Sequence, residues 1–146
     1  MKIIFGLWSA GLLLLFISCD KVDQSAQPMA GELSYFIFGH FYGECGGEGC
    51  VEIYKLEKGT LFEDTTDIYP TWMTPYDGTY ISLPDEKFEL VKDIVEHFPE
   101  ELYAETENVL GQPDAGDWGG IYVEIKYVND EENSGFWIIG NISDQG

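Results

Sequence analysis

The chain has 146 residues, of which 27 are acidic and only seven basic, and its formal net charge is −20. All seven basic residues are lysines, so the sequence lacks the arginine side chains that bind phosphate groups bidentately. Because a chain this acidic is repelled by DNA and RNA, we expect no nucleic-acid partner. The aromatic content of 15% favours a folded, β-rich domain over a disordered chain.

The first residues have the composition of an export signal. Lys2 is followed by an apolar run from Ile3 to Ile17. This run is shorter than the ~20 residues that a transmembrane helix needs, and it matches the apolar region of a secretory signal peptide. We therefore predict a signal peptide over residues 1–18.

The run ends in Phe16-Ile17-Ser18-Cys19. This stretch resembles the lipobox of bacterial lipoproteins, in which apolar and small residues precede a cysteine. The resemblance implies that Cys19 receives a diacylglyceryl group and, after cleavage before it, becomes an acylated first residue with palmitate-like chains. Two or three acyl chains suffice for a stable membrane anchor. The resemblance thus implies a lipid-anchored protein of the bacterial cell envelope, with the inner or outer membrane left open.

A polar segment without periodicity follows the cysteine. We interpret residues 19–32 as the lipidated cysteine and a flexible tether, with an rms reach of roughly 20 Å. The remaining residues, 33–146, are enough for a single globular domain with its own core.

The N-terminal part of this domain predicts strands. Residues 33–42 and 50–57 are rich in β-branched and aromatic residues, and a glycine-rich hairpin connects them. A tight turn at Lys58-Gly59 leads into a third strand over 60–64, so we expect a three-stranded antiparallel meander. A long connection follows, with a short strand at 79–82.

A helix is expected next, with Ser82 as its N-cap and Pro99 at its end. Its apolar residues recur at helical spacing at Phe88, Val91, Val95 and Phe98. Residues 99–110 could form a second short helix.

The last part predicts a hairpin. Residues 121–128 and 135–142 alternate as two strands around the polar loop NDEENS. Ile121, Val123 and Ile125 share one face of the first strand, which predicts a sheet buried on one side only. We therefore predict an α+β fold, in which an antiparallel sheet built from the meander and this hairpin is packed by one or two helices.

Cys45 and Cys50 allow three interpretations. They flank the tip of the first hairpin, where paired strands bring residues close enough for a disulfide, and an exported protein meets oxidising conditions. The alternatives are a zinc or copper site that adds His40 to the two thiolates, and a redox-active pair. A disulfide is the preferred interpretation, and no cofactor is expected.

Other candidate residues carry weaker signals. Neither His40 nor His97 lies in a catalytic motif, so we expect a protein that is not an enzyme. His97 would favour the helix dipole, and the acidic residues of two turns could hold calcium, although turn chemistry and solubility explain them equally well. Aromatic and sulfur-containing side chains could form an exposed ligand surface or cover a small core: Trp72, Met73, Tyr76, Tyr80 and Trp118.

The sequence therefore suggests two functions. The first is a non-enzymatic binding or accessory module that is tethered at a bacterial envelope. The second is a metal-binding or thiol-redox protein that uses His40, Cys45 and Cys50. The state of the two thiols distinguishes them.

Overall fold

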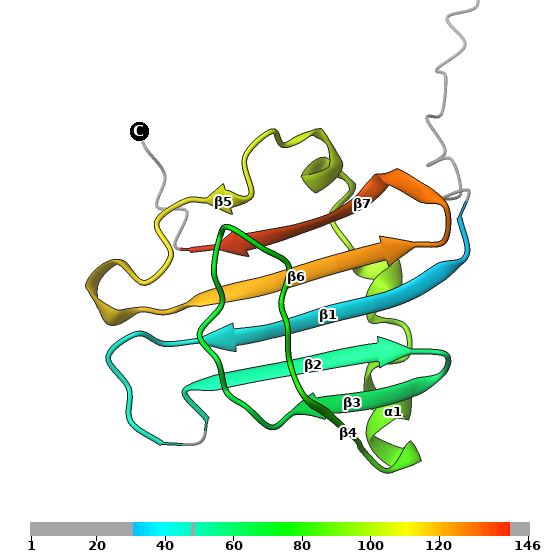
Figure 1. The fold of residues 1–146 in the computed structure, drawn as a ribbon, viewed down its shortest axis with the longest axis horizontal. Helices are drawn as coiled ribbons and strands as arrows, with labels where there is room; N and C mark the ends of the chain where they lie inside the picture. The colour runs from blue at the N-terminus through cyan, green and yellow to red at the C-terminus, as the bar shows by residue number, and fades with distance from the viewer. Residues whose placement is uncertain (1–30, 48, 141–146) are drawn as a thin grey trace, which may run out of the picture.

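The computed structural model describes residues 31–47 and 49–140, which fold around one mixed sheet (Figure 1). The predicted signal peptide, Cys19 and most of the predicted tether lie outside the described residues. The strands are β1 (Leu33–Phe41), β2 (Val51–Glu57), β3 (Thr60–Asp64), β4 (Tyr80–Ser82), β5 (Val109–Leu110), β6 (Gly120–Tyr127) and β7 (Asp130–Ile139). The helical elements are α1 (Asp85–Val91) and the 3-10 turns η1 (Ile94–His97), η2 (Glu100–Ala104) and η3 (Ala115–Asp117).

The seven strands are ordered β4-β3-β2-β1-β6-β7-β5. All neighbours are antiparallel except β5, which runs parallel to β7. The α+β class is therefore confirmed, with a fold that is mostly sheet. Strand β6 pairs directly with β1, which places the meander and the C-terminal hairpin in one sheet.

Helix α1 and the turns η1 and η2 cover one face of this sheet, which we call the helix face (Figure 1). Phe98 and Leu102 from the helical segment bury against residues of five strands. These strand residues are Phe36, Leu56, Leu61, Ile125, Tyr127 and Trp137.

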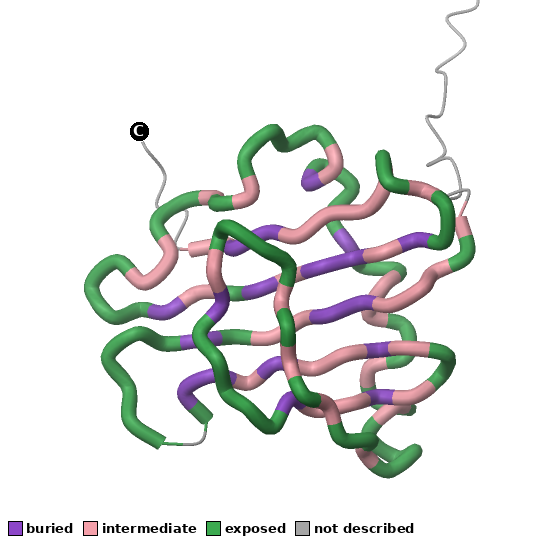
Figure 2. Tube along the Cα trace, viewed as in Figure 1, coloured by how far each residue is buried: buried purple, intermediate pink, exposed green. Residues whose placement is uncertain are grey.

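The opposite face is also buried, which corrects the prediction of a sheet covered on one side. Residues 65–79, which we call the strap, cross in front of the sheet between β3 and β4 (Figure 1). Beneath them lies a second core that includes Ile37, Phe41 and Tyr122. The buried positions accordingly run along the central strands (Figure 2). Alternate residues of β1 and β6 thus pack on opposite faces of the sheet, and both faces are buried.

The predicted long helix is broken into shorter pieces. Helix α1 begins after Pro84 rather than after Ser82, which belongs to β4, and it ends at Val91. Asp93 leaves the helical region (φ −95°, ψ 4°), and η1 then carries the chain to Phe98. Phe98 is extended (φ −63°, ψ 128°), as expected for a residue before proline, and its ring turns into the core. Residues 99–110 form η2 and β5 instead of a second α-helix.

The predicted NDEENS loop is wrong for most of its length. Strand β7 begins at Asp130, opposite Tyr127, so only Val128 and Asn129 form the turn. Asn129 adopts φ 58°, a left-handed conformation that asparagine tolerates better than most residues. Ser134 then supports an irregular start of the strand by accepting a hydrogen bond from the Tyr127 N–H.

Candidate functional site

A row of aromatic rings follows β1 along the helix face. Phe36 stacks on Phe38 at 5.5 Å between centroids, and His40 contacts Tyr42 edge-on at 5.4 Å. Side chains at alternate positions of a strand point to the same face, which is why these four are aligned. Exposure rises along the row from 3% at Phe36 to 42% at Tyr42, because the helical segment covers only the Phe36 end.

An open groove of about 430 Å³ lies where the row emerges from under the helical segment. Phe38, Ile121 and Val123 contribute to its strand side, and Ile94 and Pro99 to its helical side. His40 from β1 and His97 from η1 also line it, so the groove brings together both histidines of the chain. Among the residues lining the groove there is no lysine and no carboxylate. A chain with a net charge of −20 thus keeps an uncharged, mostly apolar groove.

A smaller hollow of about 260 Å³ adjoins this groove and shares His40 and Ile121 with it. Tyr42 and Trp118 complete its aromatic wall. Trp118 is 74% exposed, although a folded chain usually buries most of such a large ring. The aromatic surface of the helix face therefore extends from Phe38 to the loop before β6.

The five residues predicted as a ligand surface are divided between the two sides of the sheet. Trp118 belongs to the hollow on the helix face. Tyr76 and Tyr80 pack against the core under the strap. Trp72 and Met73 are exposed on the strap itself, where the Trp72 carbonyl accepts a hydrogen bond from Asn108. The ligand surface stays a prediction, and Trp118 is the member that lies beside the groove.

A network of tyrosines and two buried carboxylates holds the strap. Glu124, on β6, accepts hydrogen bonds from the Tyr35 hydroxyl at 2.7 Å, the Tyr122 hydroxyl at 2.5 Å and the Tyr76 N–H at 3.1 Å. Tyr76 belongs to the strap, so Glu124 fixes the strap to the sheet. Burial, followed by the hydrogen bond to Glu124 and the charge of Glu124, raises the pKa of Tyr35, which keeps this hydroxyl protonated as a donor.

Asp64, at the end of β3, binds both ends of the strap. Its carboxylate accepts hydrogen bonds from the Tyr76 hydroxyl at 2.8 Å and the Thr79 N–H at 2.6 Å, and from Thr66 and the Asp67 N–H. Burial acts to raise the pKa of Asp64, but these donors together hold the pKa below its usual value. The carboxylate is therefore an ionised clamp at neutral pH.

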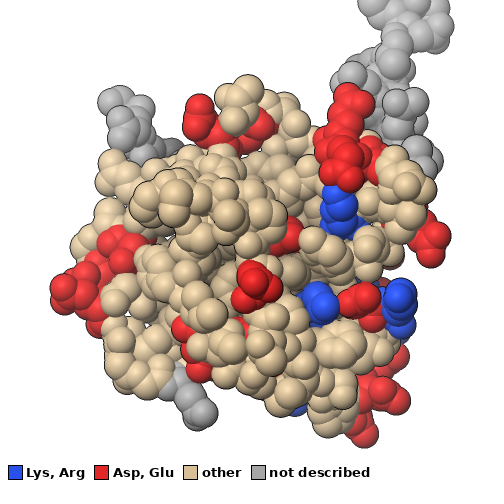
Figure 3. Space-filling model, viewed as in Figure 1, with Lys and Arg blue, Asp and Glu red and all other residues tan. Residues whose placement is uncertain are grey.

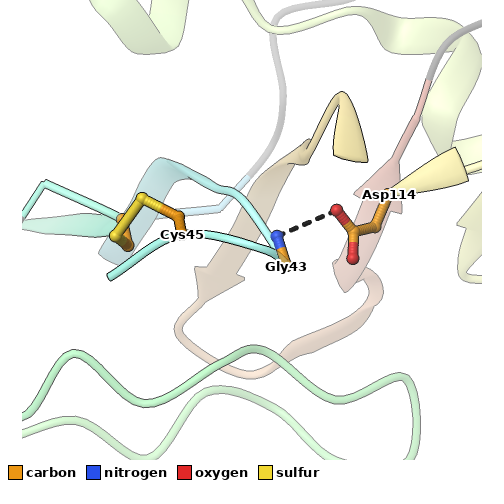
Figure 4. The surroundings of a disulfide bond; sticks show 4 residues. Gly43, Cys45 and Asp114 are labelled. Atoms are coloured by element: carbon orange, nitrogen blue, oxygen red, sulfur yellow. Dashed lines mark hydrogen bonds between the residues drawn. A yellow bond between two sulfur atoms is a disulfide. The ribbon is translucent and has the colours of Figure 1, made fainter. Parts of the chain in front are cut away.

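The two cysteines form a disulfide, as predicted. Cys45 and Cys50 are bonded with their Cα atoms 5.6 Å apart, and they close the connection between β1 and β2 (Figure 4). Neither sulfur is available to a metal ion in this oxidised state. Among residues 31–47 and 49–140, no group of three or more His, Cys, Asp or Glu side chains is placed to hold a metal.

The disulfide-bonded connection is tied to the loop that carries Trp118. The Gly43 N–H donates to the Asp114 carboxylate at 2.9 Å (Figure 4). A Cβ at Gly43 would lie 1.7 Å from that carboxylate, so a larger residue there would force the Asp114 side chain to move. Burial, followed by the charge of Asp114, raises the pKa of Tyr69 to about 12.

Three of the acidic turn residues considered for calcium have protein partners. Asp114 accepts from Gly43, Asp130 accepts from the backbone and side-chain nitrogens of Asn133, and Glu131 is paired with Lys126. These contacts are those of ordinary turns and a surface ion pair. They give calcium binding no support.

Sequence reasoning missed the groove because it treated the two histidines separately. His97 was assigned to the end of one long helix and His40 to a strand. The alternation of Phe36, Phe38, His40 and Tyr42 was the signal that could have indicated the groove. Four rings on one strand face stay partly exposed unless a helical segment as long as the row covers them. The helical cover is too short to provide it.

Comparisons with known proteins give no relative from which to argue. No protein-family model matches the chain, and neither the curated proteins nor the solved structures contain a match to it. In the described part of the chain, no helix has the length and apolar character needed to cross a membrane.

Replacing Asp64 with asparagine tests the clamp under the strap. We expect Asp64→Asn to lower the free energy of unfolding at pH 7 by about 2 kcal/mol, since hydrogen bonds to a charged acceptor are lost. Because the folded pKa of Asp64 is lowered, its stabilisation is complete above the unfolded pKa of about 4 and is lost as pH falls through the folded value. Urea unfolding at pH 7, 5 and 3 should therefore show a steeper acid loss for the wild type than for the variant.

Asp67→Asn is the matched control for this measurement. Asp67 is exposed, lies three residues away and contributes only its backbone N–H to the clamp. Equal effects of the two substitutions at pH 7 would show that Asp64 has no special role.

The redox state of the hairpin can be measured directly on protein purified from an oxidising compartment without chelator. We expect an intact mass two hydrogens below the dithiol value, no free thiol at Cys45 or Cys50, and no bound metal. Reduction should cost about 2 kcal/mol of stability, because the closed loop is short. Two free thiols with stoichiometric zinc or copper would instead support the metal-binding alternative.

Proposed function

We propose that this protein is a non-enzymatic binding module, anchored to a bacterial envelope membrane by acyl chains on Cys19. The anchor is supported by the apolar segment that ends in Phe16-Ile17-Ser18-Cys19. The polar residues up to Glu32 would let the domain stand away from the bilayer, whose anionic headgroups repel an acidic chain. The domain would then act on molecules in the envelope.

The groove between the Ile94–Pro99 segment and strands β1 and β6 would take the ligand. The observation that carries this proposal is that no charged residue lines the groove, although the chain has 27 acidic residues. Ligand sites are typically concave and apolar with a few polar groups that fix orientation. Here the two imidazoles, of His40 and His97, would serve as these polar groups.

The chemistry of the groove indicates the class of ligand. Phe38, Ile121 and Val123 would bind an aromatic or branched aliphatic group. The imidazoles can donate a hydrogen bond to, or accept one from, a polar atom of the ligand that lies beside this apolar group. Since the surrounding chain is strongly acidic, we infer a neutral or cationic ligand rather than an anion.

Binding is preferred over catalysis because the imidazoles lack the usual supporting groups. A histidine that acts as a general base is commonly oriented by a carboxylate. Neither His40 nor His97 has a hydrogen bond or ion pair to a carboxylate among the described residues. The residues that line the groove also include no serine or cysteine nucleophile.

The anchor is tested by metabolic labelling with a fatty acid that carries an alkyne. We expect the wild-type protein to incorporate the label and Cys19→Ala to lose it completely, because Cys19 would be the acylated residue. A Cys45→Ala/Cys50→Ala double variant is the control and should label normally. Label that persists on Cys19→Ala would overturn the lipoprotein proposal.

The groove is tested by fluorescence titration with the neutral apolar dye N-phenyl-1-naphthylamine. We expect Ile121→Asp to weaken dye binding at least tenfold, because apolar contact is lost and a charge is introduced into the groove. Ile81→Asp is the matched control, since Ile81 and Ile121 are both 52% exposed isoleucines on strands, and Ile81 does not line the groove.

The dye experiment separates the groove from general surface stickiness. Circular dichroism should first confirm that both variants are folded. Equal weakening by both substitutions, or no saturable dye binding by the wild type, would show that the groove is not a binding site.

A further inference from the structure

Strand β7 has an outer edge that the described chain leaves largely unpaired. Its inner edge pairs with β6 from Tyr127↔Asp130 to Ile121↔Ile139. Its outer edge pairs only at Ile138 and Ile139, with the two residues of β5. Unpaired edges of this kind offer a row of backbone donors and acceptors to another chain.

The hydrogen bonds that β7 makes on its outer edge identify which of its residues direct their backbone N–H and C=O to that side. The Ile138 N–H donates to the Asn108 carbonyl at 2.8 Å, and the Gly140 N–H donates to the Leu110 carbonyl at 2.9 Å. Alternate residues of a regular strand direct their N–H and C=O to the same side, so Phe136 also presents its own to the outer edge. Ser134 is the next alternate residue along this edge and lies where the register of β7 with β6 shifts. In residues 31–47 and 49–140 no backbone group pairs with them there.

The space beside these groups is open. A hollow of about 290 Å³ lies between the β7 edge and the segment that leads from η2 to β5. Ser134, Phe136 and Trp137 line one side, and residues such as Thr106 and Asn108 line the other. A strand added to this edge would lie ~4.8 Å from β7. It would lie on the same side of β7 as β5, which pairs with the end of that strand.

The charge around the hollow selects among possible occupants. Glu105, Glu107 and Glu132 line it, and no lysine does. Around the rest of this side of the molecule, acidic groups also greatly outweigh lysines (Figure 3). A second copy of the chain would bring further negative charge to this edge, whereas a basic segment would be attracted to it.

We propose that the outer edge of β7 at Ser134 and Phe136 binds an extended, lysine- or arginine-rich peptide segment of a partner protein as an added strand. The backbone groups of these two residues would pair with the peptide. The three glutamates would contact its basic side chains. This site is separate from the groove on the helix face and does not depend on it.

A synthetic peptide of alternating lysine and valine is the probe. We expect its addition to shift the backbone amide NMR signals of Ser134 and Phe136 and to slow their hydrogen exchange. Methylating every second peptide nitrogen leaves one edge able to pair, so binding should persist. Methylating every nitrogen should abolish it. Equal binding by the two methylated peptides would overturn strand addition.

Charge variants of the protein test the second half of the proposal. Changing Glu105, Glu107 and Glu132 together to glutamine should weaken peptide binding at least tenfold. The matched control changes the exposed residues Glu44, Glu86 and Glu96 to glutamine, which removes the same charge elsewhere and should alter affinity less than twofold. Equal weakening by both triple variants would overturn the assignment to this edge.

Two further outcomes contradict the proposal. Peptide binding that leaves the Ser134 and Phe136 amides unperturbed would place the peptide elsewhere. Concentration-dependent dimerisation that protects the same amides without peptide would make a second copy the occupant. The dye-binding result for the groove is unaffected by either outcome, so the two sites can fail separately.

Discussion

Two carboxylates buried under the strap hold the second layer of this protein in place. Asp64 and Glu124 are only 5% and 4% exposed. Each has hydrogen-bond donors from the strap, and Tyr76 contributes to both through its hydroxyl and its backbone N–H. A buried charge without such donors would be strongly destabilising. The strap therefore satisfies the carboxylates, and the carboxylates in turn fix a fifteen-residue segment without regular structure.

The network leaves one group without a partner. The Tyr80 hydroxyl is buried and makes no hydrogen bond in the described part of the chain. The Lys55 Nζ lies 4.6 Å from the centroid of the Tyr80 ring, and it also forms an ion pair with the Glu57 carboxylate at 2.8 Å. Lys55 thus contributes positive charge at the border of an acidic interior, where a cation over an aromatic face is favourable.

The strap covers one face of the sheet, whereas the helical cover of the other face is incomplete. Helix α1 and η1 are too short to cover the helix face, and the aromatic row of β1 emerges beside His97. Gly39 lies between Phe38 and His40 in the chain but at a position of the opposite strand face, paired with Ile53, where a Cβ would fall 2.0 Å from the Glu52 carbonyl. Glycine is therefore required for the close pairing of β1 and β2 at the floor of the groove.

Local patterns predicted much of the sheet and few of its polar interactions. Strand-favouring composition located β1, β2 and β3 closely, and the glycine-rich link between two cysteines predicted the disulfide, because both signals are contained in a few residues. Asp64 and Glu124 carry no such signal, since a carboxylate is usually exposed and its donors here lie up to 89 residues away in sequence. The strap, which those contacts hold, was consequently interpreted as a plain connection.

The same limit explains the misassigned edge of the sheet. Five polar residues in a row predict a loop, yet Asp130–Ser134 belong to β7, where edge positions can stay solvated. An outer edge strand needs apolar residues only on the faces that other elements cover, and at this end of β7 that cover is incomplete. The polar residues at the start of β7 thus indicate a strand edge that is accessible to solvent, and the strand continues through them. The polar residues Asp130–Ser134, which the sequence pattern assigns to a loop, are thus the start of the strand whose outer edge we propose as a peptide site.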